Sequence, residues 1–342
     1  MRKIKNILAV ALIIIFVLFC FFHAETVKSA VYDAIMRCLT VIIPSLYAMM
    51  IISGLLVKSN IASAGRLFSG IFSMLAGYPV GAKILSSQYA DGSINRKNAE
   101  LLSGIFFGAG GAFIFSCTSY GGGLILSSNI MANAILFLML TFYFRKNPIE
   151  KNKRKKIEFS AEMLINSVNS AGHSMAEICF AVLAFAVITA VLRDFGVLSF
   201  LAEILSQASG FSVETAEKII CSAIDVTAIN DLTKENANLI PVASGLVSFG
   251  GFCVFLQISA IFKGKMSVFP LILFRTAAGI LSGLICKILL FFFADDEIIA
   301  VSLINTHLHK SPSPVPSILL IIMTAVLFWE YEKNLKKFHK TS

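Results

Sequence analysis

The chain has 342 residues, of which 57% are hydrophobic and 14% are charged, and its mean hydropathy is +0.81. Soluble domains carry about 25% charged residues, so this composition excludes an ordinary soluble enzyme and indicates a polytopic membrane protein. The net charge of +9 does not indicate nucleic-acid binding, because much of the basic excess lies in short loops between apolar runs. We therefore expect a lipid bilayer around the chain and no nucleic-acid partner.

The apolar runs predict an all-α fold with about eight transmembrane helices and two broken segments. The eight spans are predicted at Ile7–Phe22, Leu39–Val57, Glu100–Cys117, Leu124–Phe144, Ala176–Leu192, Leu239–Phe262, Val268–Phe293 and Ser317–Trp329. The first span has the length of a signal-peptide core, and we expect it to remain as an uncleaved anchor. The broken segments are Leu67–Ser86 and Ile219–Leu232. Phe159–His173 predicts an amphipathic stretch, and Phe195–Ser209 predicts an interfacial helix.

The distribution of lysine and arginine predicts the orientation of these spans. We set the N-terminus in the cytoplasm and count each broken segment as a re-entrant hairpin. The basic loop Arg145–Lys156, the turn with Lys263 and Lys265, and the basic C-terminal tail then all lie inside. The acidic run Asp295–Glu297 lies outside. Counting either hairpin as a full span would move some basic clusters outside, so the charge pattern favours the hairpins.

This topology predicts an inverted repeat. The expected parts are an anchor helix over 1–30, a first unit over 31–144, a basic cytoplasmic loop over 145–160, a second unit over 161–293, and a linker with a C-terminal transmembrane helix over 294–342. Each unit has a span, a broken hairpin and a span with a glycine pair, Gly110 and Gly111 or Gly250 and Gly251. Glycine pairs also occur where helices merely pack closely. Their matched position after a broken hairpin favours alternating-access transport, and all four glycines are candidate binding residues.

The first broken segment carries the candidate binding residues Gly77, Tyr78, Pro79, Gly81 and Lys83. The two glycines let the backbone unwind, and the proline stops a helix. An interrupted helix in hydrocarbon must line a protein-walled cavity, and its freed N–H groups would attract a carboxylate. Lys83 suits weak, reversible binding of an anion. In the alternative reading, Lys83 reaches the membrane surface and Tyr78 is an interfacial anchor.

The second half of the chain supplies four further candidates for substrate binding. Asp225 lies in the second broken segment, where it would carry a coupling proton, pair with Lys83 in the empty carrier, or simply cap a helix. Thr227 could cap the same break. Arg275 lies well inside a span and is predicted to bind an anion or to hold a structural partner, such as Gln257 or a free carbonyl.

No pattern for catalysis, a metal or a cofactor is found in the sequence. GxSxG and HExxH arrangements are absent, and the seven cysteines lie in or beside apolar stretches without a CxxC pair. Asn166, Asn169 and His173 share one helix face, which is more typical of a membrane surface or a pore wall than of a metal site. His307 and His309 would need further ligands to form a metal site, and we do not expect one there. We expect a protein that is not an enzyme.

The run Gly77–Lys83, GYPVGAK, resembles the GYPxGAK signature of the YlbJ-type sporulation integral membrane proteins, which carry Gate (nucleoside-recognition) domains. Ala223–Thr227, and Ser248–Gly251 with Gln257 beyond it, are similar to two further stretches of that family. The resemblance covers residues 40–290. It implies a transporter that moves dipicolinic acid (pyridine-2,6-dicarboxylate) into the developing spore across the outer forespore membrane.

Other functions are compatible with the same resemblance. Gate domains also occur in nucleoside and ion carriers, so the fold leaves the substrate open. The chain departs from the family at Phe107–Gly111, which lacks an asparagine-rich stretch before Gly-Pro, and at Asp225, where glutamate is usual. A paralogue with another substrate, in the cell membrane, is therefore one alternative. A non-transporting scaffold that binds other sporulation membrane proteins, or forms a homo-oligomer, is another.

Overall fold

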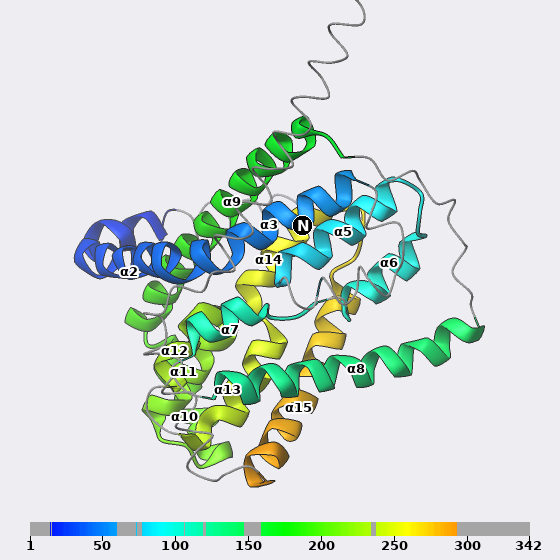
Figure 1. Ribbon diagram of the computed structural model, residues 1–342. Coiled ribbons are helices and arrows are strands. Elements are labelled where there is room, and N and C mark those ends of the chain that lie inside the picture. The colour runs from blue at the N-terminus through cyan, green and yellow to red at the C-terminus, as the bar shows by residue number, and fades with distance from the viewer. Residues whose placement is uncertain are drawn as a thin grey trace, which may run out of the picture.

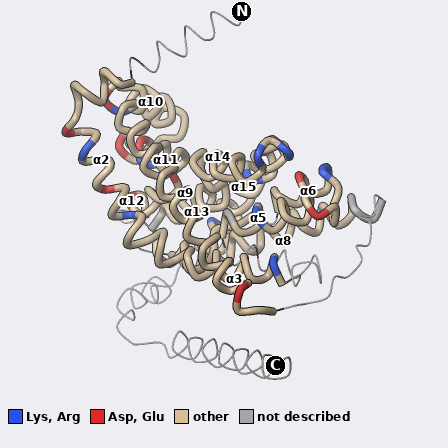
Figure 2. Tube along the Cα trace, turned by 90° about the horizontal axis from the view of Figure 1, so that it is seen from above, with Lys and Arg blue, Asp and Glu red and all other residues tan. Residues whose placement is uncertain are grey.

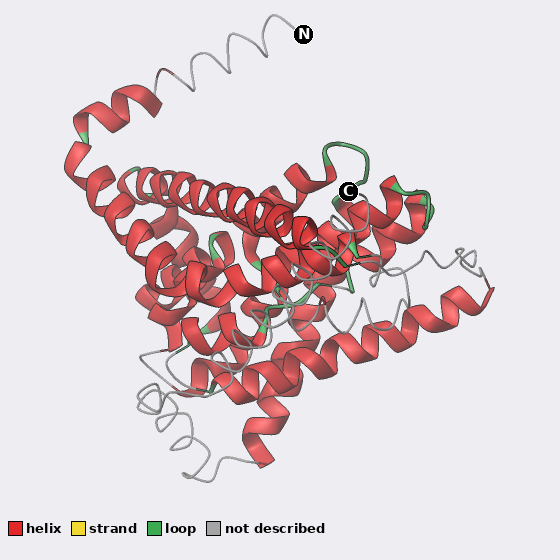
Figure 3. Ribbon diagram, turned by 45° about the horizontal axis from the view of Figure 1, so that its top comes forward, coloured by secondary structure: helices red, strands yellow, loops and turns green. Residues whose placement is uncertain are grey.

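The computed structural model describes residues 14, 16–59, 73, 77–105, 107–118, 121–146, 159–233 and 237–292. Throughout these residues the regular structure is helical, without a strand (Figure 3). Several predictions lie wholly or mostly outside them. These are the anchor up to residue 13, the first arm of the hairpin Leu67–Ser86, residues 147–156 of the basic loop, the acidic run Asp295–Glu297, His307, His309 and the C-terminal helix Ser317–Trp329.

Figure 1 shows the described helices in chain order, from α2 to α15. They are α2 (Ala24–Arg37), the π-helical turn η1 (Cys38–Ile42), α3 (Ile43–Lys58), α5 (Tyr78–Ala90), α6 (Arg96–Ser103), α7 (Gly111–Cys117), α8 (Gly122–Lys146), α9 (Ala161–Asp194), α10 (Val197–Ser209), α11 (Val213–Ile224), the 3₁₀ turn η3 (Val226–Ala228), α12 (Ile229–Thr233), the 3₁₀ turn η4 (Ala237–Leu239), α13 (Ile240–Phe249), α14 (Gly251–Phe262) and α15 (Phe269–Phe292).

Five helical stretches among the described residues are long and apolar enough to cross a membrane. They are Ala24–Lys58, Gly122–Phe142, Ala161–Asp194, Ile240–Phe262 and Phe269–Phe292. Charged residues are sparse along the body that these helices form (Figure 2). The prediction of an α-helical membrane protein is confirmed to this extent. The count of eight spans and the inverted repeat stay predictions.

The predicted span Leu39–Val57 is part of a longer helix, because the helix already begins at Ala24 and continues to Lys58. Pro44 has no N–H and would clash with a carbonyl one turn earlier in a regular α-helix. The π-helical turn Cys38–Ile42 precedes it and accommodates the missing bond. The Ser45 hydroxyl donates to the carbonyl of Val41 at 2.6 Å, so side-chain bonds take up carbonyls near the turn.

The predicted amphipathic stretch Phe159–His173 leads directly into the predicted span Ala176–Leu192, because residues from Ala161 onward belong to the single helix α9. The Ser160 side chain caps its start by accepting a bond from the backbone N–H of Met163 at 3.2 Å. No proline lies between the two predicted segments, and the glycine at Gly172 is tolerated inside a helix.

Two predicted spans are interrupted where glycines occur. Glu100–Cys117 divides into α6 and α7, with residues 107–110 in non-helical conformation. A Cβ on Gly104 would lie 2.5 Å from the Cβ of Phe274 in α15, so the chain leaves α6 in close contact with that helix. Leu239–Phe262 divides into α13 and α14 at Gly250, whose φ is +94°. Glycine pairs therefore mark helix ends in both halves of the chain.

The remaining described predictions agree with the observed helices. Leu124–Phe144 and Val268–Phe293 correspond to α8 and α15, and α10 lies within Phe195–Ser209. The segment Ile219–Leu232 is broken as predicted, because α11 ends at Ile224 and the 3₁₀ turn η3 follows. The interfacial position of α10 stays a prediction.

The second half contains the closest helix packing, between α13 and α15 (Figure 1). A Cβ on Gly279 would lie 2.9 Å from the carbonyl oxygen of Gly245, which no larger residue could tolerate without separating the helices. A chain of buried hydroxyls joins α8 to the same pair. Ser128 lies 2.7 Å from Ser244, and Ser244 lies 2.8 Å from Ser282. This packing fixes α13, and with it the break at Gly250.

Candidate functional site

The interrupted helices of the two halves meet at one place, which we call the crossing. It is formed by the start of α5 at Tyr78, the non-helical segment 107–110, the turn at Asp225 and the glycine pair Gly250 and Gly251. The first two come from the first half of the chain and the last two from the second. The sequence predicted these residues as site elements, and the structure brings them into contact.

Tyr78 links the two halves. Its ring centroid lies 4.9 Å from that of Phe107 and 5.8 Å from that of Phe113. Its hydroxyl donates a hydrogen bond to the carbonyl of Val247, in the last turns of α13. The side chain is buried, with 3% of its surface exposed. Tyr78 is therefore part of the protein interior in this structure and not an interfacial anchor.

We expect Tyr78→Phe to destabilise the protein measurably. The substitution keeps the ring contacts but leaves the Val247 carbonyl without this donor, and a lost buried hydrogen bond of this kind costs about 1–2 kcal/mol. Thermal unfolding of the purified protein in detergent would detect the change. Tyr32→Phe is the control, because Tyr32 is 62% exposed. Equal melting temperatures for both variants and the parent would contradict the structural role of the hydroxyl.

Gly77 explains why α5 begins where it does. Its φ is +106°, a conformation that other residues rarely adopt. An added Cβ would lie 3.2 Å from Leu46 Cδ2 and 3.5 Å from the backbone nitrogen of Gly110. Pro79 follows in the first helical turn, where a missing N–H removes no helical hydrogen bond. Gly81 is buried in that turn.

The pair Gly250 and Gly251 lies between the interrupted segments of the first half and the turn at Asp225. Both residues have positive φ, +94° and +82°. A Cβ on Gly250 would lie 3.0 Å from Phe107 Cε1, whereas one on Gly251 would lie 3.1 Å from the backbone nitrogen of Val226. The corresponding position in the first half is more open, since a Cβ on Gly111 would meet Leu126 Cδ2 only at 3.7 Å. The pair Gly250 and Gly251 thus determines how closely Phe107 of the first half and Val226 of the second half approach α14.

Asp225 caps the break that follows α11. One carboxylate oxygen accepts from the backbone N–H of Thr227 at 3.0 Å, and the other accepts from the Thr227 hydroxyl at 2.8 Å. The carboxylate is buried, and the charge of Arg37 in α2 attracts it. The structure does not pair Asp225 with Lys83. Of the roles predicted for Asp225, the helix cap describes the observed geometry.

Lys83 lies in α5 and points to α9. Its Nζ donates to the hydroxyl oxygen of Ser170 at 2.9 Å and to that of Ser174 at 3.3 Å. The side chain is half-buried, and among the described residues it forms no ion pair. The carboxylate of Glu177 attracts it from a greater distance, and Lys58 repels it. Lys83 thus places a positive charge between two helices, where neutral hydroxyls are its partners among the described residues.

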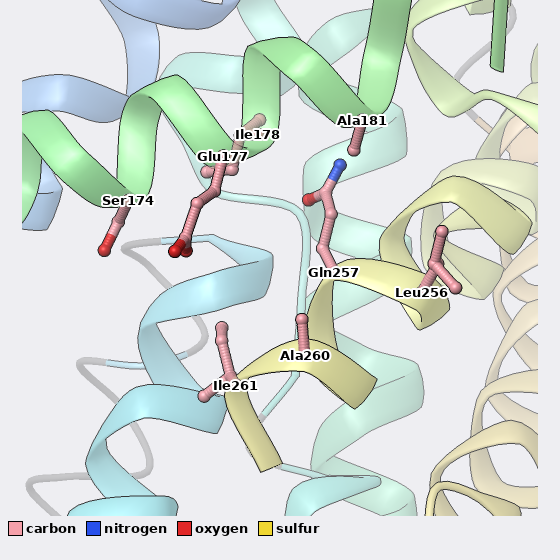
Figure 4. A pocket seen from close by; sticks show the side chains of 8 residues that line it. All are labelled: Ser174, Glu177, Ile178, Ala181, Leu256, Gln257, Ala260 and Ile261. Atoms are coloured by element: carbon pink, nitrogen blue, oxygen red, sulfur yellow. The ribbon is translucent and has the colours of Figure 1, made fainter. Parts of the chain in front are cut away.

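A cavity of about 220 Å³ lies next to Lys83, between α9 and α14 (Figure 4). Ser174 belongs both to its wall and to the partners of Lys83. The other polar lining residues are Glu177 and Gln257, and the remaining five are apolar. The Gln257 side chain extends from α14 toward α9, and its amide nitrogen lies 3.3 Å from the sulfur of Cys253.

Arg275 is fully buried and joins two of the interrupted segments. Its Nη1 donates to the carbonyl of Phe107 at 2.6 Å and to that of Ser248 at 3.3 Å, while Nη2 donates to the side-chain oxygen of Asn133. The guanidinium carbon also lies 5.1 Å from the Phe107 ring centroid. These bonds describe a structural clamp, and binding of substrate by Arg275 stays a prediction.

The sequence analysis did not single out Ser170, Ser174 and Glu177, which lie three and four residues apart on one face of α9. It singled out the adjacent face of Asn166, Asn169 and His173, and these three side chains are exposed. The spacing of polar residues along α9 is compatible with either face as part of a site. The hydrogen bonds from Lys83 identify the face of Ser170 and Ser174.

Comparisons with protein-family models, with curated proteins and with solved structures give no significant match for this chain.

Proposed function

We propose that this chain is a membrane carrier of a small organic anion, with dipicolinate as the favoured solute because of the GYPxGAK resemblance. One observation carries the proposal. Lys83, on an interrupted helix of the first half, donates to Ser174 in the wall of a cavity that α14 of the second half also lines, and no carboxylate pairs with this lysine among the described residues. Broken helices with such charges form the substrate sites of secondary transporters.

The charge and the size of the cavity support a compact anionic solute. Lys83 lies beside the cavity, whereas the positive ends of α5 and α14 lie at the crossing and not at the cavity, which the C-terminal half of α14 lines. The cavity is small compared with ligand pockets of about 300–1,000 Å³, which favours a compact solute of one ring. Its apolar lining would contact such a ring, while Lys83 would bind a carboxylate.

We further propose that the two halves form an inverted repeat with a re-entrant hairpin in each, within about eight spans. In each half a glycine pair begins a second helix, at Gly111 in α7 and at Gly251 in α14. That correspondence supports alternating access by movement of one half against the other. The favoured location is the outer forespore membrane of a sporulating bacterium, which follows from the resemblance alone.

Transport of labelled dipicolinate into liposomes that contain the purified protein tests the proposal. We expect saturable uptake by the parent and at least about a tenfold loss in Lys83→Ala, because a charge–carboxylate contact is worth about 1.4 kcal/mol or more. Lys28→Ala is the matched control, since Lys28 is exposed and pairs with the likewise exposed Glu25 of the same helix. Lys83→Arg should keep binding and lose turnover, because a rigid guanidinium fork holds a carboxylate more firmly.

Three results would point elsewhere. Uptake of uridine without uptake of dipicolinate would retain the carrier and reassign its substrate to nucleosides. Equal uptake by the parent and Lys83→Ala would remove Lys83 from the site. Absence of any uptake, with normal assembly of sporulation membrane proteins around the chain, would favour the scaffold.

A further inference from the structure

Two long helical stretches from different halves of the chain pack against each other. One is formed by α2, η1 and α3, and the other is α9 (Figure 1). His23 Nδ1, at the start of α2, lies 3.1 Å from a carboxylate oxygen of Asp194, at the end of α9. Toward the other ends, an added Cβ on Gly54 would lie 3.1 Å from the Cβ of Ser167. The two stretches are therefore antiparallel, and these contacts fix which residues face each other.

Cys38 and Cys179 face each other between those contacts. Each lies 15 residues from the contact of His23 with Asp194, counted from 23 to 38 on one stretch and from 179 to 194 on the other. A hydrogen bond joins the two thiols, with one S–H donating to the other sulfur. Cα atoms of η1, which begins at Cys38, come within 8 Å of Cα atoms of α9. A disulfide forms where Cα atoms are about 4.4–6.8 Å apart, a spacing within reach of two helices packed this closely.

The exposure of the two cysteines determines the order of a reaction with hydrogen peroxide. Cys179 is partly exposed on α9, whereas Cys38 is buried beside it. The thiolate of Cys179 therefore attacks a peroxide oxygen first, the O–O bond breaks, and a sulfenic acid forms as water leaves. The thiolate of Cys38 then attacks the Cys179 sulfur, the S–O bond breaks, and a second water leaves. Two thiols are oxidised to one disulfide, their protons end in water, and one peroxide is reduced to two waters.

A disulfide at this place would join the two halves of the carrier. Cys38 belongs to the first proposed unit, over residues 31–144, and Cys179 belongs to the second, over residues 161–293. Alternating access requires one unit to move against the other. Helix α9 also carries the serine hydroxyls that accept bonds from Lys83. A covalent bond between η1 and α9 therefore fixes the helix that contacts this lysine.

We propose that Cys38 and Cys179 are a redox-sensitive pair: a peroxide converts them into a disulfide, which locks the two halves together and stops transport until a thiol reductant breaks the bond. The lock rests on the function proposed above, whereas formation of the disulfide does not. Reduction returns both sulfurs to thiols by exchange with the reductant, which is itself oxidised to a disulfide.

Peptide mapping of the purified full-length protein tests the disulfide. The protein in detergent is treated with hydrogen peroxide, the remaining thiols are alkylated, and the digest is analysed by mass spectrometry. We expect a species that links the peptides of Cys38 and Cys179 and disappears on treatment with dithiothreitol. Cys38→Ser and Cys179→Ser should each abolish it. Cys221→Ser is the matched control and should retain it, because Cys221 is also partly exposed but its sulfur lies 3.6 Å from Arg193 Nη2.

Uptake of labelled dipicolinate into liposomes that contain the same samples tests the lock. We expect peroxide to reduce uptake by the parent to the level of protein-free liposomes, and dithiothreitol to restore it. Cys179→Ser should retain its uptake after peroxide treatment, because it cannot form the bond. Cys221→Ser should lose and regain uptake as the parent does.

The two measurements separate the possible failures. Peroxide treatment that yields no peptide linking Cys38 to Cys179 would overturn the redox pair, whatever the protein transports. A disulfide that forms fully and leaves dipicolinate uptake unchanged would overturn the lock. Absence of uptake by the untreated parent would overturn the proposed substrate together with the lock, and the peptide map would still decide for or against the disulfide.

Discussion

Gly251→Ala should lower the free energy of unfolding by about 3 kcal/mol or more. The position has a φ of +82°, which costs an alanine about 1–2 kcal/mol by itself. The added Cβ would also lie 3.1 Å from the nitrogen of Val226 and 3.2 Å from the carbonyl oxygen of Ala223. Both are backbone atoms at a helix end and cannot rotate away as a side chain could, so the crossing would have to open.

Thermal unfolding in detergent, followed by the loss of monodisperse protein, measures this effect. Gly111→Ala is a matched control, because this glycine has the corresponding position in the first half and the contacts of its added Cβ are at ordinary distances of 3.7 Å and 3.9 Å. The control should stay within about 0.5 kcal/mol of the parent. A Gly251→Ala variant as stable as Gly111→Ala would contradict the close approach of Gly251 to the turn at Asp225.

Helix breaks could be predicted from sequence where a residue actively opposes helix formation. Gly77 with Pro79 gave such a signal, and the polar Asp225 inside an apolar run gave another; the start of a helix after Gly77 and the break at Asp225 are observed. The breaks near Gly110 and at Gly250 were not predicted, since a glycine pair in an apolar run is compatible with a continuous helix that packs closely. Those breaks depend on contacts with distant residues such as Phe107 and Val226.

The partners of Lys83 could not be predicted, because they depend on the rotation of α9 about its axis. Ser167 packs against Gly54 of α3, where an added Cβ on the glycine would lie 3.1 Å from the Cβ of the serine. Ala171 and Met175 are buried on the same side of α9. This contact turns Ser170 and Ser174 toward α5 and leaves Asn169 exposed. The sequence shows two polar stripes on α9, and only the packing of α3 selects between them.

Arg275 connects the packing of the second half to the crossing, and its removal should have the second large effect. Its guanidinium lies among carbonyl oxygens and has no carboxylate partner among the described residues. The carbonyl of Ser248 is near the C-terminal end of α13, where the helix dipole favours a cation. Phe107 contributes both its carbonyl and its ring face. The guanidinium of Arg275 thereby donates hydrogen bonds to backbone carbonyls at two helix breaks.

We expect Arg275→Met to lower the free energy of unfolding by about 3–5 kcal/mol, because buried oxygens that accept from a charged donor would lose it. Arg275→Lys should recover only part of this loss, since an ammonium cannot reproduce the planar fork that reaches Phe107, Ser248 and Asn133 together. Arg96→Met is the control, because Arg96 is a mostly exposed partner of Glu100 and such pairs contribute about 1 kcal/mol or less.

Melting temperature and dipicolinate affinity, measured on the same samples, distinguish the clamp from a binding residue. For a clamp, Arg275→Lys loses stability while the fraction that remains folded binds dipicolinate as the parent does. For a substrate ligand, it keeps the parent's melting temperature and loses affinity. The bonds from Nη1 to the Phe107 and Ser248 carbonyls favour the first result, since those carbonyls belong to two interrupted segments that Arg275 holds together at the crossing.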